Sequence, residues 1–333
     1  MKTKRQFGFT IVELMVVIVV IGILASISVV GYGAWQKRTT ENVVKSDLTN
    51  AVAAMENART FGNTYPATVP STFTPSSGVV LSGGGTSGGK NFCITATQNS
   101  SNYRVTNYSA PKPGSCSGPA RDEVSIIKWN SWTLGTGGVT GYSLNGDGNS
   151  RITDTNPWGV SDTVWDVSNQ DAASNADGGW NSSGFSIDNT KLYRFSTFVR
   201  RKTIGNGNFY FGTHGYPDAV LNRSNGVANT NPYFYAASWW GNTYQWYLVT
   251  GYIWPAGSGT GAAMPDSGLY AMNGTKLASS GDFVWQSTTT SSNHRSYLYY
   301  STNVTTNQQW YQPRVDVVDG TEPTIDELLN NTF

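Results

Sequence analysis

A single carboxylate lies inside the apolar segment near the start of the chain. Glu13 is the third residue of the run from Ile11 to Val30, where nearly every other residue is Val, Ile, Leu, Met, Ala, Ser or Gly. An unpaired carboxylate buried in lipid costs on the order of a few kcal/mol, so it needs a cationic partner that also lies in the lipid. Glu13 is therefore a candidate functional residue. A simple single-span anchor with an incidental glutamate is the alternative.

Two cysteines could form one cross-link. Cys93 and Cys116 are the only cysteines in the chain, and both lie well outside the apolar run. Two cysteines this close together fit a single disulfide made in an oxidising compartment, or else two free buried thiols. Export of the region that follows the apolar run favours the disulfide.

An oxygen-rich segment offers candidate metal ligands. The segment 145–149 reads Asn-Gly-Asp-Gly-Asn and is followed by Asp154, a spacing similar to that of a calcium loop. It departs from that loop because Ser143 stands at the first acidic position and Asp154 replaces the closing glutamate. A simple turn is one reading. A structural calcium ion held by Asp147, Asp154 and Asp177 is the alternative, and the sequence predicts no other cofactor.

Aromatic side chains are dense in the second half of the chain and could bind sugars. Eleven of the twelve tryptophans fall between Trp129 and Trp310. Aromatic rings can stack on the apolar faces of sugar rings, and Tyr and Trp add a polar group. Along a strand only about half of the side chains face outward, so many of these rings are expected in the core. The candidate ligand-binding residues are Trp239, Trp240 and Tyr244.

The residues needed for hydrolysis are scarce. The three glutamates after residue 119 all lie near the ends of that region, and hydrolysis of a glycosidic bond ordinarily needs two facing carboxylates about 5–9 Å apart. His214 and His294 are the only histidines, and neither lies in a triad or zinc-binding motif. We therefore expect a protein that is not an enzyme.

A membrane-spanning helix is the first element that these residues require. The run 11–30 is about twenty residues long, which at about 1.5 Å per residue crosses the hydrocarbon core of a bilayer. Lys2, Lys4 and Arg5 precede it, so the positive-inside rule places the leader in the cytoplasm and the rest outside. An ordinary secretory signal is the competing interpretation, but its apolar stretch would be shorter.

The helix should continue beyond the membrane. From Ala34 to about Thr60 there is no proline, and apolar residues recur at helical spacing. These residues would pack on a globular head: Val43, Val44, Leu48, Val52 and Met55. A helix from residue 9 to 60 would be about 75 Å long.

The segment Gly8-Phe9-Thr10-Ile11-Val12-Glu13-Leu14 resembles the prepilin cleavage and methylation motif of type IV pilins and type II secretion pseudopilins. The resemblance implies that a prepilin peptidase cuts between Gly8 and Phe9, and that Phe9 becomes the N-methylated terminus. It also implies that Glu13 neutralises the terminal amine of a neighbouring subunit during filament assembly. The implied partners are other pilin subunits, the prepilin peptidase and the inner membrane. The protein would be a single-pass membrane protein before assembly, and afterwards part of an extracellular filament or the cell surface.

A small β head should follow the helix. Turn-forming residues dominate after Thr60, and two short alternating runs, 91–96 and 103–106, predict a β-hairpin. A bridge from Cys93 to Cys116 would tie the end of this sheet to its beginning. Small pilin heads commonly carry such a bridge.

The composition changes at about residue 119, and strand-like runs then recur between turn clusters. They predict an antiparallel β-sandwich, expected to be a jelly roll of the concanavalin-like kind. In composition and layout this region resembles the lectin-like jelly rolls found as carbohydrate-binding modules. Thr324 and Glu327 predict a capping box at the start of a short closing helix. The predicted strands are 192–200, 208–212, 245–254, 282–286, 295–300 and 310–317.

The whole chain is therefore predicted to be of the α+β class. The predicted divisions are a leader at 1–8, a helix at 9–60, a disulfide-linked head at 61–118 and a sandwich at 119–333.

A filament protein that displays a binding domain is the function these predictions favour. The net charge is +1 and there is no basic stripe beyond the local cluster 200–202, so nucleic-acid binding is not expected. The leading interpretation is a minor or tip pilin-like subunit whose sandwich mediates adhesion, with surface glycans as the candidate ligand. The alternatives are a pseudopilin of a type II secretion or DNA-uptake machine and a membrane-anchored glycan hydrolase.

Overall fold

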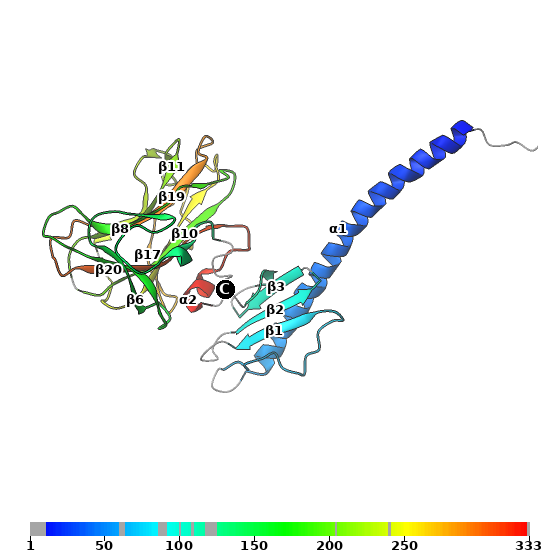
Figure 1. Ribbon diagram of the computed structural model, residues 1–333, viewed down its shortest axis with the longest axis horizontal. Coiled ribbons are helices and arrows are strands. Elements are labelled where there is room, and N and C mark those ends of the chain that lie inside the picture. The colour runs from blue at the N-terminus through cyan, green and yellow to red at the C-terminus, as the bar shows by residue number, and fades with distance from the viewer. Residues whose placement is uncertain are drawn as a thin grey trace, which may run out of the picture.

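A long helix, a small sheet and a large β-sandwich follow one another along the chain (Figure 1). The computed structural model describes residues 11–59, 64–85, 92–99, 101–107, 110–116, 125–203, 205–238 and 241–331. The predicted leader, residues 1–8, lies outside these residues.

Helix α1 (Ile11–Asn57) is the N-terminal element, and its 47 residues correspond to a length of about 70 Å. Its C-terminal half packs on the head, where Val44, Leu48 and Met55 are fully buried at the predicted helical spacing. Val43 and Val52 are partly buried in the same cluster. The predicted continuation of the helix beyond residue 34 is therefore confirmed.

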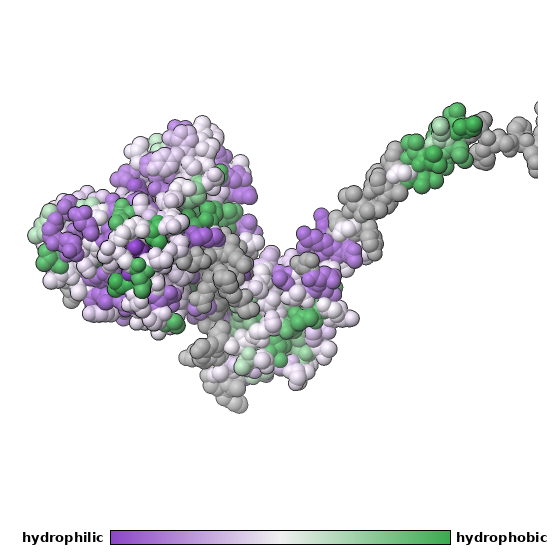
Figure 2. Space-filling model, viewed as in Figure 1, coloured by the Kyte–Doolittle hydropathy of each residue, from purple (hydrophilic) through white to green (hydrophobic). Residues whose placement is uncertain are grey.

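The beginning of α1, from Ile11 to Ile21, exposes apolar side chains (Figure 2). Every side chain described from Ile11 to Ile21 is between 48% and 77% exposed. Within the described residues, no helix combines the length and the apolar character needed to cross a membrane. The side chains of residue 13 and of residues 23–30, which belong to the predicted span, lie outside the described ones.

The head is a four-stranded antiparallel sheet in the order β1-β2-β3-β4. The predicted hairpin is confirmed, since β2 and β3 pair from Cys93 opposite Thr106 to Gln98 opposite Ser101. The predicted disulfide is confirmed as well, with Cys93 and Cys116 joined and their Cα atoms 5.7 Å apart. The strands are β1 (Val80–Gly85), β2 (Phe92–Gln98), β3 (Ser101–Thr106) and β4 (Lys112–Pro113).

The sandwich is built from a ten-stranded and a six-stranded sheet. The larger sheet has the order β13-β12-β18-β15-β10-β20-β7-β6, with β16 paired to β15 and β17 paired to β16. Its strands are β6 (Asn149–Thr155), β7 (Ser161–Ser168), β10 (Tyr193–Arg201), β12 (Val220–Asn222), β13 (Ala228–Asn229), β15 (Tyr247–Trp254), β16 (Gly268–Ala271), β17 (Lys276–Ser279), β18 (Phe283–Val284) and β20 (Asn307–Val317).

The smaller sheet has the order β14-β11-β19-β8-β5, with β9 beside β19. Its strands are β5 (Tyr142–Leu144), β8 (Ala176–Ser182), β9 (Phe185–Ser186), β11 (Asn208–Tyr216), β14 (Tyr233–Ser238) and β19 (Ser291–Tyr299). A short 3-10 helix, η2 (Trp129–Ser131), precedes the first of these strands.

The two sheets share one aromatic core. Phe195 on β10 lies 5.3 Å from Phe234 on β14, ring centre to ring centre. Across the same layer, Trp310 on β20 donates its indole N–H to the hydroxyl of Ser296 on β19 at 2.7 Å. The predicted sandwich is therefore confirmed. Its strands pair antiparallel except for β15 and β18, which are parallel, and the jelly-roll topology stays a prediction.

Helix α2 (Ile325–Asn330) closes the described chain and lies between the sandwich and the head (Figure 1). The predicted capping box is present, since Thr324 and Glu327 exchange side-chain and backbone hydrogen bonds. Leu328 and Leu329 are buried in the sandwich core. On the other side, the fully buried carboxylate of Glu327 accepts a hydrogen bond from Lys112 of the head at 2.9 Å.

Candidate binding site

The outer face of the six-stranded sheet carries the candidate site. Along β11, Phe209 and Phe211 point into the core and are at most 2% exposed, whereas Tyr210 between them is half-buried on the other face. Strand β19 pairs with β11 so that Tyr297 lies directly opposite Tyr210. Alternation along each strand thus gathers tyrosines on one face of the sheet.

Two glycines make room for these rings. A Cβ atom on Gly212 would come within 2.6 Å of the Tyr233 ring. A Cβ atom on Gly179 would come within 2.9 Å of the Tyr297 ring and within 2.2 Å of the Ser296 carbonyl oxygen. Gly179 also has a φ of 141°, which favours glycine. Both rings can therefore lie close to the backbone of the neighbouring strand.

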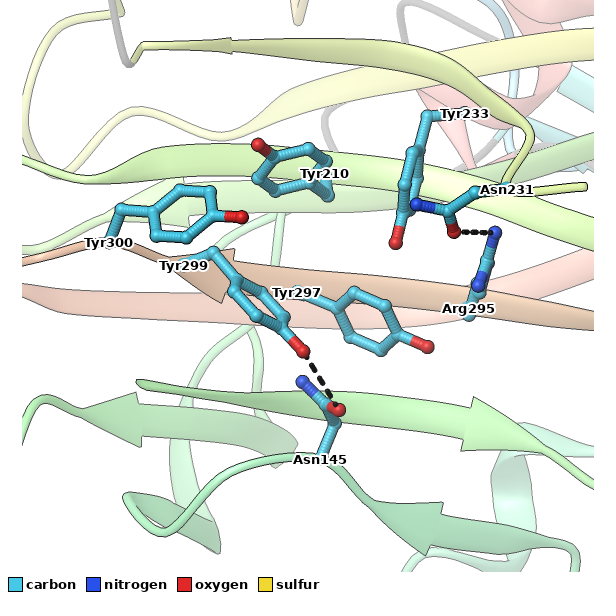
Figure 3. Close-up of a pocket in the computed structure, with 8 residues that line it drawn as sticks. All are labelled: Asn145, Tyr210, Asn231, Tyr233, Arg295, Tyr297, Tyr299 and Tyr300. Carbon is cyan, nitrogen blue, oxygen red and sulfur yellow. Dashed lines mark hydrogen bonds between the residues drawn. The ribbon is translucent and has the colours of Figure 1, made fainter. Parts of the chain in front are cut away.

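The tyrosines contact one another mainly edge to face (Figure 3). The ring centres of Tyr210 and Tyr233 are 4.8 Å apart, and those of Tyr297 and Tyr299 are 5.6 Å apart. Tyr300 adds a ring 5.4 Å from Tyr299 and is 48% exposed. Such contacts hold the rings in place and present both ring faces and hydroxyl edges to a ligand.

One cation lies at the edge of this cluster. The guanidinium of Arg295 on β19 lies 4.4 Å from the centre of the Tyr233 ring and 6.0 Å from that of Tyr297. Its Nη2 donates hydrogen bonds to the side-chain oxygen of Asn231 at 2.9 Å and to the carbonyl of Pro232 at 3.3 Å. These contacts orient the guanidinium beside the rings (Figure 3).

An amide completes the opposite side of the site. Asn145, in the turn before β6, accepts a hydrogen bond from the Tyr299 hydroxyl at 3.4 Å. Its side-chain nitrogen has no hydrogen-bond partner within the described part of the chain. The segment 145–149, which the sequence offered as either a turn or a calcium loop, therefore contributes an amide to the tyrosine cluster.

Together these residues enclose a pocket of about 450 Å³. It is lined by Asn145, Tyr210, Asn231, Tyr233, Arg295, Tyr297, Tyr299 and Tyr300. Volumes of about 300–1,000 Å³ are typical of small-molecule sites. Rings for stacking and hydroxyls, amides and a guanidinium for hydrogen bonding suit a polyhydroxylated ligand.

Two tyrosine hydroxyls of the pocket, those of Tyr233 and Tyr297, are held protonated at neutral pH. Burial raises the pKa of Tyr297 to about 12 and that of Tyr233 above its ordinary value, although the Arg295 cation acts to lower both. The hydroxyl of Tyr297 donates to the side-chain oxygen of Asn181 on β8. These two hydroxyls are therefore neutral groups that can both donate and accept hydrogen bonds.

Of the predicted ligand-binding residues, the structure describes only Tyr244, which lies outside this pocket. Tyr244 is 64% exposed, as a surface residue should be, but it belongs to a different hollow of about 390 Å³ with Trp246 and Met272. Trp239 and Trp240 lie outside the described residues. The sequence therefore located an exposed tyrosine correctly but did not identify the tyrosine-lined pocket.

The predicted calcium ligands do not come together. Within the described residues, no three carboxylate, histidine or cysteine side chains form a group that could hold a metal ion. Asp154 belongs to β6, where its carboxylate pairs with Arg200 and Lys202 at 2.9 Å each. Burial opposes its ionisation, but hydrogen bonds from Lys202 and Gln309 hold its pKa well below the ordinary value. Its negative charge is thus already compensated by cations of the protein.

The other two predicted calcium ligands have different environments. Asp147 is exposed in the turn before β6, whereas Asp177 on β8 is buried and accepts a hydrogen bond from the backbone N–H of Ser301 at 2.9 Å. Burial raises the pKa of Asp177 to about 6. Of the two readings of the segment 145–149, the turn describes the structure.

The predicted processing and assembly residues are only partly described. Gly8 and Phe9 lie outside the described residues. The backbone of Glu13 belongs to α1, but its side chain is not among those described. Their predicted roles in cleavage, methylation and assembly stay predictions.

The pocket residues had a recognisable signal in the sequence. The segments Phe209-Tyr210-Phe211 and Tyr297-Leu298-Tyr299 alternate a tyrosine with a purely apolar residue, which places the tyrosines on one face. The pairing of β11 with β19, which brings the two segments together, depends on register and could not be read from either segment alone.

Comparison with known proteins identifies the N-terminal motif. Residues 3–29 match the family model of the prokaryotic N-terminal methylation motif. The chain is also similar to the type II secretion system core protein G of Aeromonas hydrophila, with 37% identity over 68 residues, and of Klebsiella pneumoniae, with 37% identity over 65 residues. Each alignment covers 20% of this chain and 48% or 46% of the relative, respectively. The chain therefore spans about half the length of these curated relatives, and the predicted motif is confirmed.

Solved structures resemble the sandwich only distantly. The CBM22-1 xylan-binding domain from Paenibacillus barcinonensis Xyn10C aligns with a TM-score of 0.28 and 11% identity, covering 58% of this chain and 91% of that chain. An exo-beta-agarase aligns with a TM-score of 0.36 and 10% identity, covering 62% of this chain and 26% of that chain. The assignment of a sandwich therefore rests on the strand pairing and the shared core.

Proposed function

We propose that this chain is a pilin-like filament subunit whose sandwich binds glycans through the tyrosine-lined pocket. The observation that carries the proposal is the cluster of five tyrosines, two asparagines and one arginine around a pocket on the outer face of a sheet. The N-terminal methylation motif of the same chain supports a place in a filament.

The chemistry of the pocket suits a sugar better than an apolar ligand. Tyrosine rings offer flat apolar faces for the C–H groups of a sugar ring, and the neutral hydroxyls match its hydroxyl groups. Tyr300 and Tyr210 at the rim are at least partly exposed, so a ligand can reach them from solvent.

A binding role is favoured over catalysis. None of the eight residues that line the pocket is Asp, Glu or His. Hydrolysis of a glycosidic bond by the usual route needs two carboxylates at the scissile bond. We therefore propose that the pocket holds its ligand without cleaving it.

The order of the elements supports display of the sandwich. The N-terminal end of α1 and the sandwich lie at opposite ends of the molecule, with the head between them (Figure 1). We propose that α1 anchors the precursor in the inner membrane and, after cleavage between Gly8 and Phe9 by a prepilin peptidase, packs with other pilin subunits. The sandwich would then project from the filament.

A minor or tip subunit is the position that we favour. The predicted sandwich, residues 119–333, is much larger than the head, and a domain of this size on every subunit would crowd a helical filament. We expect few copies per filament, which can be counted by quantitative mass spectrometry of purified filaments.

Binding of the full chain to a glycan array tests the proposed site. Tyr299→Ala should abolish the binding shown by the wild type, because it removes a central ring and its hydroxyl. Tyr244→Ala is the matched control, since it removes an exposed tyrosine outside the pocket. Loss of binding in the control but not in Tyr299→Ala would move the site to the hollow at Tyr244, and absence of any binding by the wild type would refute the glycan-binding role.

A pseudopilin is the second candidate. The similarity to the type II secretion system core protein G favours it, and in that case the sandwich would contact secreted cargo. Purified surface filaments distinguish the two candidates, because a pseudopilin would be absent from them and a minor pilin would be present.

A further inference from the structure

Arg295 is a cation without a carboxylate partner in the described part of the chain. Its polar contacts are an amide oxygen and a backbone carbonyl, at 2.9 and 3.3 Å, and its remaining close neighbours are tyrosine rings. A half-buried charge flanked only by neutral dipoles and rings keeps most of its attraction for an anion.

Three other arginines of the sandwich have carboxylate partners, whereas Arg151 and Arg223, like Arg295, donate to carbonyl oxygens and stack on an aromatic ring. Arg194 and Arg314 share the buried carboxylate of Asp316 at 2.8 Å, and Arg200 pairs with Asp154 at 2.9 Å. The fold thus neutralises those guanidinium groups by internal ion pairs. The guanidinium of Arg295 instead borders the pocket.

The described residues that line the pocket add no compensating negative charge. The seven other lining residues are asparagines and tyrosines, which are neutral near pH 7. Among the groups with the largest effects on the pKa of Tyr233 and Tyr297, the charged one is Arg295 and the others are neutral side chains. The pocket is therefore locally positive, although the whole chain has a net charge of only +1.

We propose that the pocket selects carboxylated saccharides, with Arg295 binding the carboxylate and the tyrosine rings stacking on the sugar. This inference rests on the proposed glycan-binding function and specifies its ligand. A guanidinium presents its N–H groups in a planar fork that matches a carboxylate. The stack of Arg295 on Tyr233 fixes the plane of that fork beside the rings. Uronic acids and sialic acids both combine a carboxylate with a hydroxylated ring.

Matched pairs of saccharides test the proposal with the full chain in detergent. Trigalacturonate is compared with its methyl ester, and 3′-sialyllactose with lactose, by isothermal titration calorimetry. We expect the acid of at least one pair to bind about tenfold more tightly than its neutral counterpart, as a charge-assisted hydrogen bond requires. The pair that shows this preference distinguishes a uronate from a sialate ligand. The preference should decrease as salt is added.

Arg295→Gln should remove the preference, which is measured as the ratio of the affinities for the acid and the neutral saccharide of each pair. Lys191→Gln is the matched control, because it removes one positive charge from an exposed side chain outside the pocket and should retain the preference. Thermal unfolding checks that both variants fold. If Arg295→Gln is unfolded, Arg295→Lys is used, which keeps the charge without the fork and should retain only part of the preference.

Two results would overturn the proposal. One is equal affinity of the wild type for acid and neutral saccharides. That result would refute the proposed selectivity but would agree with the proposed glycan-binding function. The other is an acid preference that Arg295→Gln, or Arg295→Lys where that variant is used, retains in full. Failure of the wild type to bind any saccharide would refute the proposed function itself, and with it this inference.

Discussion

Two buried titratable residues of the sandwich respond to pH in opposite directions. His294 is fully buried between the rings of Trp180 and Phe195, at 4.9 and 5.3 Å, and burial lowers its pKa to about 4. Asp177, on the neighbouring strand β8, has its pKa raised to about 6 by burial. At a pH between the folded-state pKa of either residue and its ordinary pKa, the folded and unfolded chains bind different numbers of protons. The free energy of unfolding therefore depends on pH.

We expect Asp177→Asn to make the protein lose stability more steeply on acidification. From about pH 6.5 down to about pH 4, the unfolded chain binds a proton on His294 that the folded chain does not, so acid favours unfolding by up to about 3 kcal/mol. Over part of this range the folded chain holds a proton on Asp177 that the unfolded chain lacks, which offsets the loss. Removing the carboxylate removes the offset.

Denaturant unfolding followed by tryptophan fluorescence measures this effect, since eleven of the twelve tryptophans lie after residue 128. The free energy of unfolding is compared between about pH 4.5 and 7.5. Asp147→Asn, a change of the same kind at an exposed position, should follow the wild type. Parallel profiles for Asp177→Asn and the wild type would contradict the expected offset.

The residues of the pocket were only partly predictable. The density of aromatics predicts a binding surface, and alternation along a strand leaves Trp239, Trp240 and Tyr244 as surface candidates. The pocket instead combines residues far apart in the chain, such as Asn145 and Tyr299. Which of many tyrosines share one face depends on strand register, which a single sequence does not reveal.

Among the elements, those defined by local pattern were predicted best. Helix α1 and the hairpin of β2 and β3 follow from helical spacing and from alternation across a short turn. The strand β6 was missed, because its polar residues from Asn149 to Thr155 were read together with the preceding turn. They form a strand because β7 pairs with them along seven residues, a contact that no local pattern shows.

Helix α2 links the sandwich to the head through one buried ion pair. Glu327 accepts hydrogen bonds from Lys112 at 2.9 Å and from Thr106 at 3.1 Å, both on the head. Lys112 also donates to the carbonyl of Glu322 at 2.7 Å. The capping box predicted the helix, whereas the partner of its glutamate on another domain could not be predicted from the sequence.

Glu327→Ala should destabilise the protein by about 3–5 kcal/mol and loosen the junction between head and sandwich. The change leaves the ammonium of Lys112 buried without its carboxylate, which is the costly way to break a buried pair. Thermal unfolding measures the stability, and limited proteolysis of the segment between residues 116 and 125 reports on the junction.

Asp326→Ala provides the matched control, because Asp326 is exposed on the same helix. The pair of changes Lys112→Met and Glu327→Leu should recover much of the lost stability, since it removes both charges together. A Glu327→Ala variant as stable as this control would show that the ion pair does not hold the two domains together.

At the scale of the whole molecule, the chain places the proposed binding pocket and the proposed assembly helix on separate domains. The head lies between them and contacts both, through the buried face of α1 and through Lys112 (Figure 1). A load on a bound glycan would therefore pass from the sandwich through α2 and the head into α1. This arrangement suits adhesion, provided that α1 is held in a filament.

Assembly should depend on Glu13 and not on the pocket. In a filament, the carboxylate of Glu13 is expected to neutralise the terminal amine of a neighbouring Phe9, because an unpaired charge among apolar helices is costly. We expect Glu13→Ala to reach the membrane and to be processed between Gly8 and Phe9, but to be missing from sheared filaments by immunoblotting.

Glu41→Ala, on the same helix beyond the apolar run, should assemble normally. Recovery of Glu13→Ala in filaments at the wild-type level would refute the assembly role. The tyrosine pocket would then be displayed by an anchor that does not rely on this carboxylate.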